Sequence, residues 1–343
     1  MFGLARRGTR RGSKGAGSPG DDMDDGRARI AVIGCGAWGT NHIRTLAQLG
    51  YLAAVADERG ERSFEVAAEF GVPPLAPGQV MDSPEIDGVV LALPAELHAP
   101  MAIEALERGK HVLAEKPLAL TAAEGERAVG AARAAGRTLM VGHVLRHHPA
   151  FRTLHDTVRD GVIGEVRYVQ SHRQGFGRFH ASFDAAWDLA PHDLSLVLAI
   201  TGEPPDLAVA RGTAALAPSR DTALIYMTFP SGIGAHVVVS RTDPVRLRRF
   251  TVTGTTGSLV FDDLREGTEK LALYRHSLSQ NPGGGHSFEL GDPVYLPFPE
   301  GMPLLEELRN FAAAIEGKAE PLTPGEDGVK VVRILERTLP MDG

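Results

Sequence analysis

The chain has 343 residues, of which 43% are hydrophobic and 23% charged, and its formal net charge is −7. This length and composition fit two globular domains with cores of their own and exclude a disulfide-stapled mini-protein. The apolar runs are too short for a membrane span, and the single cysteine, Cys35, excludes an internal disulfide and a cysteine-rich zinc site. We therefore expect a cytoplasmic protein with no membrane partner.

Residues 1–27 differ from the rest of the chain. They contain six basic residues, four aspartates and many glycines and serines, with no apolar segment of the kind a secretory signal needs. The segment is predicted to be a disordered tail. The remainder is acidic and does not attract a phosphate backbone, so no nucleic-acid partner is expected.

Residues 28–146 show short apolar runs that alternate with segments of helical periodicity. This alternation predicts an α/β domain with a doubly wound parallel sheet of the Rossmann type. The predicted strands are 30–33, 52–56, 89–93, 111–114 and 138–141, and the predicted helices include 43–49, 64–70, 101–107 and 122–135.

The pattern changes after residue 146. Residues 147–303 contain one helical segment near 150–160 and then successive strand-like runs with turn residues between them, which predicts an α+β domain with a mainly antiparallel, open sheet. Residues 304–343 are predicted to form closing helices, at 304–316 and 326–337. The predicted strands of the second domain are 166–172, 207–211, 223–229, 234–240, 249–254 and 258–261.

The first strand runs directly into Gly34-Cys35-Gly36-Ala37-Trp38-Gly39, a G-x-G-x-x-G pattern that opens the first helix. In this context Gly34 permits a tight turn, Gly36 lets a pyrophosphate approach the backbone, and Gly39 allows close packing of helix on strand. The N–H groups at the start of the helix, from Ala37 and Trp38 onward, favour an anion. The pattern predicts a dinucleotide site.

Asp57 ends the second predicted strand, where a carboxylate can accept hydrogen bonds from the ribose hydroxyls of adenosine. A carboxylate there disfavours a 2′-phosphate, so NAD is the expected cofactor. Arg59 could accommodate that phosphate and leaves NADP open. Glu58 lies between them and is included among the expected cofactor contacts.

Polar residues also follow other strands. Glu115-Lys116-Pro117 lies at the carboxyl end of a predicted strand, where open α/β sheets bind ligands. The segment 92–98 ends the preceding strand, and Asp188 and His192 open a predicted helix of the second domain. Taken alone, Lys116 reads as a surface lysine, and Asp188 as a helix N-cap.

In combination these motifs resemble the Gfo/Idh/MocA family of NAD(P)-dependent oxidoreductases, over nearly all of the chain from Arg29 to about Arg337. The resemblance implies that Lys116, Asp188 and His192 form the catalytic group. A histidine base would take the hydroxyl proton, a lysine cation would stabilise alkoxide charge, and Asp188 would orient the imidazole or the substrate. The further cofactor contacts that it implies are Leu93, Pro94, Ala95, His98, Glu115 and Lys116.

The segment from Trp187 to Ser195 looks more like the branch of nucleotide-sugar and amino-sugar enzymes than like other members. Arg173 and Arg178 are therefore expected to contact a phosphate or carboxylate of the substrate, with a solvated strand and loop as the alternative. His143, His148 and Trp187 are further candidates for the substrate site, core packing being the alternative for Trp187. No cysteine or carboxylate lies at metal-ligand spacing from His143, His147 and His148, so no metal is expected.

The resemblance thus implies a hydride transfer between the nicotinamide and a secondary alcohol or ketone of a sugar, expected to be nucleotide-linked and to react at C3. The alternatives are a free sugar, a sugar phosphate or a cyclitol, and a non-catalytic NAD-binding regulator. The family also implies a homodimer or homotetramer formed through the C-terminal sheet.

Overall fold

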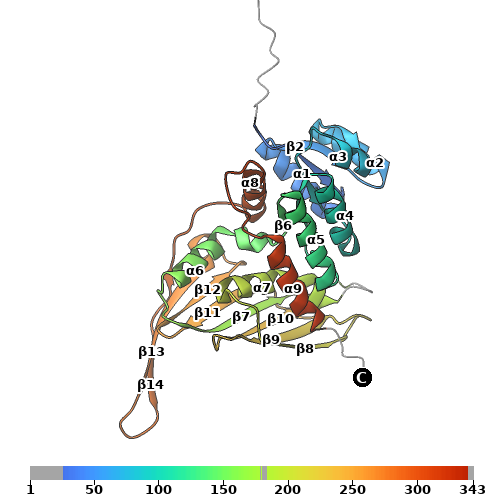
Figure 1. Ribbon diagram of the computed structural model, residues 1–343. Coiled ribbons are helices and arrows are strands. Elements are labelled where there is room, and N and C mark those ends of the chain that lie inside the picture. Colours follow the sequence, from blue (N-terminus) through green and yellow to red (C-terminus); the bar gives the residue numbers. More distant parts are fainter. Residues whose placement is uncertain (1–25, 178, 180–183, 339–343) are drawn as a thin grey trace, which may run out of the picture.

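The computed structural model describes residues 26–177, 179 and 184–338, so most of the predicted tail lies outside the described residues. The N-terminal part contains a six-stranded parallel sheet in the order β3-β2-β1-β4-β5-β6 (Figure 1). Its strands are β1 (Ile30–Ile33), β2 (Leu52–Ala56), β3 (Pro74–Leu75), β4 (Gly88–Leu91), β5 (His111–Ala114) and β6 (Leu139–Val141). The connecting helices are α1 (Ala37–Leu49), α2 (Gly60–Phe70), α3 (Pro77–Asp82), α4 (Ala95–Glu107) and α5 (Ala122–Ala135).

Strand β1 explains why this sheet is covered on both faces. All four of its residues are buried. Ile30 and Val32 pack in one core cluster with Ile43 of α1, whereas Ala31 and Ile33 pack in a second cluster on the opposite face. A continuous apolar run of this kind suits a central parallel strand with helices on both sides.

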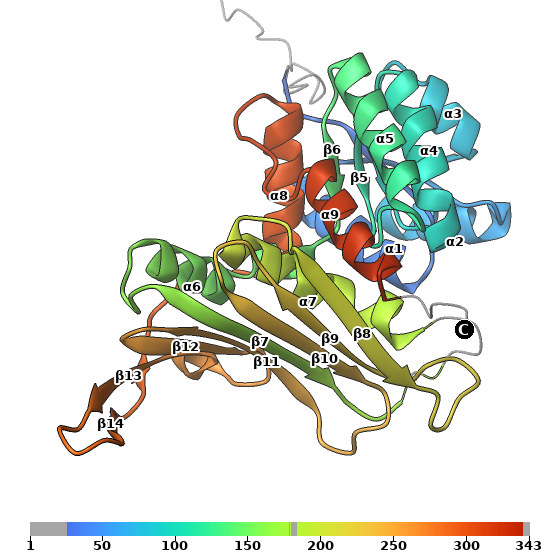
Figure 2. The ribbon, with the colours of Figure 1, turned by 60° about the horizontal axis from the view of Figure 1, so that its bottom comes forward.

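A nine-stranded mixed sheet forms the C-terminal part, in the order β14-β13-β12-β11-β7-β10-β9-β8 with β15 beside β13. Strands β7 and β10 are parallel, and the other pairs are antiparallel. Helices α6 (Pro149–Arg159) and α7 (Ala185–Thr201) cover the face toward the N-terminal sheet, and no element formed by the described residues covers the opposite face (Figure 2). The strands are β7 (Val166–Gln174), β8 (Leu207–Thr213), β9 (Thr222–Thr228), β10 (Gly234–Ser240), β11 (Leu247–Gly254), β12 (Gly257–Asp262), β13 (Leu271–Gln280), β14 (His286–Leu290) and β15 (Val294–Tyr295).

The two C-terminal helices return to the N-terminal sheet. In α8 (Pro303–Ile315), Leu308 and Phe311 belong to the same core cluster as Ile30. Helix α9 (Gly325–Glu336) packs against α5 and α7, and the backbone N–H of Val141 donates to the carbonyl of Thr323 (2.9 Å). The end of the chain thus completes the cover of its first sheet.

The structure confirms the predicted fold class, with differences in some elements. The helix predicted at 101–107 is longer in the structure: it begins at Ala95, directly after its N-cap Pro94, and includes Pro100. The 3₁₀ helix at Val144–His147 and the β13–β15 strands were not predicted, and the glycine-rich segment 281–285 is the turn between β13 and β14. No helix among the described residues is long and apolar enough to cross a membrane.

Candidate active site

The glycine-rich turn lies between β1 and α1, and its three glycines meet different surroundings. Gly34 has φ +104°, and a Cβ there would lie 2.2 Å from the carbonyl oxygen of Ala92. A Cβ at Gly39 would lie 1.8 Å from the carbonyl oxygen of Gly34, so side chains are excluded at both positions. A Cβ at Gly36 would meet nothing within 4 Å.

The exposed part of this turn suits an anion. Gly36, Ala37 and Trp38 are exposed, whereas Gly34 and Gly39 are buried. Gly36 is the N-cap of α1, and no side chain caps the helix. The backbone N–H groups of the first turn therefore remain available to a pyrophosphate, which fits the predicted dinucleotide site.

Asp57 follows β2 and braces the same turn. Its carboxylate accepts hydrogen bonds from the backbone N–H groups of Cys35 (2.7 Å) and Arg59 (2.9 Å). Burial opposes ionisation, yet these hydrogen bonds keep the pKa of Asp57 below its usual value. A charged acceptor therefore stands beside the turn, with the exposed side chain of Arg59 next to it (Nε to Oδ1, 3.4 Å). Glu58 is exposed at the same corner.

The segment after β4 lies beside this turn, since β4 pairs with β1 and the carbonyl of Ala92 faces Gly34. Leu93 is half-buried, Pro94 is the N-cap of α4, and Ala95 is the first residue of that helix. The ring nitrogens of His98 lie 2.7 Å from the carbonyl oxygen of Pro117 and 2.8 Å from that of Leu93. His98 thus joins the loops after β4 and β5 rather than facing solvent.

Glu115, directly after β5, is buried and anchors the neighbouring lysine. Its carboxylate bonds to His42 Nε2 (2.8 Å) and accepts a hydrogen bond from the indole N–H of Trp38. Burial alone would raise the pKa of Glu115, but its His42 hydrogen bond and the charges of His42 and Lys116 lower it. The carboxylate therefore fixes the backbone from which Lys116 projects.

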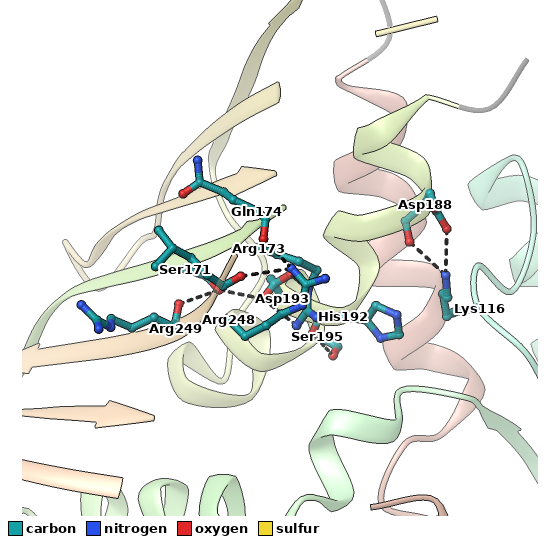
Figure 3. Close-up of polar contacts among 11 residues, drawn as sticks. Lys116, Ser171, Arg173, Gln174, Asp188, His192, Asp193, Ser195, Arg248 and Arg249 are labelled. Atoms are coloured by element: carbon teal, nitrogen blue, oxygen red, sulfur yellow. Dashed lines mark hydrogen bonds and ion pairs between the residues drawn. The ribbon is translucent and has the colours of Figure 1, made fainter. Parts of the chain in front are cut away.

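Lys116 reaches from the first sheet to helix α7 of the second domain. Its Nζ donates to the backbone carbonyl of Asp188 (2.9 Å) and lies 3.4 Å from Asp188 Oδ1 (Figure 3). Arg241, which is almost fully buried, donates from Nη2 to Asp188 Oδ2 (2.8 Å). Burial opposes ionisation of Asp188, yet Lys116 and Arg241 lower its pKa. Asp188 therefore pairs with two cations and makes no hydrogen bond to the imidazole, which leaves the expected orientation of the substrate as a prediction.

His192 lies one turn after Asp188 in α7, between the Lys116–Asp188 pair and the pair formed by Arg173 and Asp193 (Figure 3). Its Nδ1 is buried and has no hydrogen-bond partner among the described residues. Burial, followed by the charges of Lys116 and Arg173, lowers the pKa of His192 well below its usual value. The imidazole is neutral at pH 7 and can accept a proton.

The other candidates for the substrate site lie in different places. His143 is buried, and burial lowers its pKa to about 4. His148 caps α6, with Nδ1 3.1 Å from the backbone nitrogen of Ala150, and Trp187 is 6% exposed in the core cluster of the second sheet. Trp187 therefore packs in the core, which is the alternative that the sequence offered for it. Arg178 lies outside the described residues.

Arg173 is bound to a carboxylate that the sequence left without a role. Its Nε lies 2.5 Å from Asp193 Oδ2, and its Nη2 lies 3.2 Å from Oδ1. Arg241, likewise unpredicted, directly follows the end of β10. The sequence feature that could have indicated Arg241 as a site residue is its position as a basic residue just after a predicted strand. In the described part of the chain, no three His, Cys, Asp or Glu side chains gather where they could hold a metal ion.

Comparisons with known proteins agree with this geometry. Residues 28–143 match the model of the oxidoreductase family with an NAD-binding Rossmann fold, and residues 151–260 match the model of the Gfo/Idh/MocA C-terminal domain. The UDP-N-acetylglucosamine 3-dehydrogenase of Acidithiobacillus ferrooxidans is 34% identical over 225 residues, which is 65% of this chain and 70% of that protein.

Two further likenesses extend over more of the chain. The NAD⁺-dependent scyllo-inositol 2-dehydrogenase of Bacillus subtilis is 28% identical over 88% of this chain and 90% of its own length. The solved structure of the A. ferrooxidans 3-dehydrogenase covers 91% of this chain and 96% of its own, with a TM-score of 0.77 and 29% identity. With both domains matched in order and the nucleotide crevice formed as described, the chain belongs to the Gfo/Idh/MocA family of NAD-binding oxidoreductases.

Proposed function

We propose that the protein interconverts a secondary alcohol and a ketone on the ring of a sugar, with NAD(P) as the redox partner. A bound nicotinamide supplies the hydride acceptor or donor for such a reaction. The observation that carries the proposal is the approach of Lys116, from the carboxyl end of β5, to the α7 segment that bears Asp188 and His192. Two domains thus bring a cation and a neutral imidazole to one crevice.

The roles of these residues follow from their surroundings. His192 accepts the hydroxyl proton during oxidation and returns it during reduction. Lys116 stabilises the negative charge that develops on the same oxygen. Asp188 positions the Lys116 ammonium through the 2.9 Å and 3.4 Å contacts to its carbonyl and carboxylate oxygens. We assign it no direct contact with the imidazole.

The substrate that we propose is a nucleotide-linked sugar that reacts at C3. The name of the A. ferrooxidans relative supports it, at 34% identity. A cyclitol is the second candidate, supported by the inositol dehydrogenase that aligns over 88% of the chain. We further propose a cytoplasmic homodimer or homotetramer formed through the uncovered sheet face. Exposed apolar side chains on that face support this, namely Leu207, Val209, Leu224 and Tyr226.

Turnover of a substrate panel tests the proposal. Purified protein is assayed with NAD and NADP against UDP- and dTDP-linked sugars, sugar phosphates, free sugars and inositols. Lys116→Met and His192→Asn are each expected to lower kcat by about 100-fold or more, while NAD affinity measured by calorimetry stays within about threefold. Full turnover in both variants, or NAD binding with no turnover of any substrate, would overturn the proposal, and the second result would favour a regulator.

A further inference from the structure

Two arginines lie directly opposite each other at the ends of strands β7 and β11. The antiparallel register pairs Arg173 with Arg248. This pair is two residues along each strand from the pair Ser171 and Phe250, so both pairs share one face of the sheet. Both arginines point to the sheet face that α7 covers, whereas Arg249 points to the uncovered face. Like charges directly opposite on adjacent strands destabilise a sheet, so this pairing needs a compensating anion.

The structure supplies that anion to only one of the two. Asp193 accepts two hydrogen bonds from Arg173, at 2.5 Å and 3.2 Å, and a third from the hydroxyl of Ser171 (2.7 Å). The Asp193 side chain is 3% exposed. Its carboxylate is therefore committed to Arg173 and Ser171.

Arg248 has no such partner. Its Nη1 donates to the backbone carbonyls of Gln174 (3.1 Å) and Leu247 (3.0 Å), and no carboxylate of the described residues lies within ion-pair distance. The Arg248 residue as a whole is partly exposed. Burial and the neighbouring charges of Arg173 and Arg246, only partly offset by Asp193 and Asp263, lower the pKa of Arg248 to about 10.

This partly exposed arginine lies beside the candidate catalytic group. Arg248 is one of the charges that act on His192, and Figure 3 shows it on the side of His192 opposite Lys116. Positive charge without a protein partner at the edge of a crevice attracts an anionic ligand.

We propose that Arg248 binds an oxyanion of the substrate, with Arg173 as the fixed second charge behind it. This inference rests on the proposed sugar oxidoreductase function and deepens it by naming the substrate class. The planar guanidinium suits bidentate recognition of a phosphate or a carboxylate. The oxyanion is either the diphosphate of a nucleotide sugar or the carboxylate of a uronic acid.

The test compares Arg248→Gln and Arg248→Lys with the matched control Arg249→Gln. Arg249 is adjacent on the same strand, faces the uncovered side and pairs with Asp262 (3.0 Å). Binding of UDP and of glucuronate to the NAD-loaded enzyme is measured by calorimetry, and kcat and KM are measured for a UDP-linked sugar and for a neutral inositol. Unfolding temperature is recorded for every variant.

Arg248→Gln is expected to weaken binding of one anion by about tenfold or more, with partial recovery in Arg248→Lys and no change in Arg249→Gln. A loss for UDP assigns the diphosphate, and a loss for glucuronate assigns the carboxylate. The KM of the neutral substrate and the unfolding temperature should not worsen, since a like-charge pair is relieved.

The inference is overturned if the wild-type protein binds neither anion, or if Arg248→Gln leaves both affinities unchanged. It is also overturned if neutral and anionic substrates are weakened alike with a lower unfolding temperature, because that pattern describes a structural residue. Failure of the proposed function gives a different result, namely no turnover of any sugar by the wild-type protein. The anion-binding measurement is independent of turnover.

Discussion

Lys116 and Asp188, 72 positions apart and in different domains, are joined by the 2.9 Å hydrogen bond from the lysine Nζ to the aspartate carbonyl oxygen. A backbone acceptor does not titrate, so this contact persists whatever the charge of the Asp188 side chain. The second contact, 3.4 Å to Oδ1, is electrostatic and can be removed without changing the backbone. The two contacts can therefore be tested separately.

Asp188→Asn keeps the shape of the side chain and removes its charge. We expect kcat to fall by about tenfold and stability to fall by about 1–3 kcal/mol, because Lys116 and the buried Arg241 both lose an anionic partner. Steady-state kinetics and urea unfolding measure the two effects. A variant with wild-type kcat would show that the carbonyl contact alone positions Lys116.

The acidity of His192 predicts an unusual pH profile. Burial and nearby cations lower its pKa well below 6.5, so the neutral base persists as the pH falls through that value. The acid limb of kcat/KM for sugar oxidation should therefore lie below pH 6.5, and reduction, which needs the protonated ring, should gain as the pH falls through that same limb. A limb at or above pH 6.5 in the oxidation profile would contradict this assignment.

Glu307 of α8 predicts a pH-dependent stability. Its side chain is fully buried, and neither carboxylate oxygen has a partner among the described residues. Burial, followed by the charge of Glu115, raises the pKa of Glu307 well above 4.5. The folded state therefore keeps a proton that the unfolded chain releases above about pH 4.5, which destabilises the fold increasingly as the pH rises.

Glu307→Gln should accordingly raise the unfolding temperature by a few degrees at pH 8 and much less at pH 5. Scanning calorimetry at the two pH values measures the difference. Glu306→Gln is the matched control, because Glu306 is partly exposed and pairs with Arg309 (2.8 Å). An equal effect of Glu307→Gln at both pH values would mean that ionisation of this carboxyl does not affect folding.

Asp57 predicts the cofactor preference. Asp57→Ala removes the acceptor of the Cys35 and Arg59 backbone N–H groups. We expect KM for NAD to rise by about tenfold and the ratio of NAD to NADP efficiency to fall, since a carboxylate no longer repels a 2′-phosphate beside Arg59. Kinetics with both cofactors measure the change. Asp82→Ala, at an exposed aspartate that pairs with Arg108, is the control.

The sequence was most informative where local backbone chemistry dictates the structure. Gly34 needs a positive φ and space for the Ala92 carbonyl, so the glycine pattern that begins there predicts the tight turn from the sequence alone. Lys116 could be placed because it follows a strand of the parallel sheet. The β13–β14 ribbon was missed because β14 and the second half of β13 are exposed and mix polar with single apolar residues. Only the start of β13, from Leu271 to Leu273, is buried.

Contacts between distant segments could not be predicted from the sequence. The residues near Asp188 in the chain give no indication that Arg241 pairs with it. The sequence showed Asp193 only as the residue after His192, and its ion pair with Arg173 of β7 became known from the structure. Trp187 shows the same limit in reverse. One aromatic residue next to predicted site residues is compatible with a sugar contact as well as with a core position, and the packing of α7 places it in the core.

The return of α8 to the first sheet also affects how the protein is made. Leu308 and Phe311 of α8 complete the core that contains Ile30 of β1. Strand β1 is synthesised early, but its core can form fully only after α8 has been synthesised. A nascent chain must keep that apolar face away from other chains while the second domain is synthesised. The order in which the segments emerge thus delays completion of the first core until the second domain has been made.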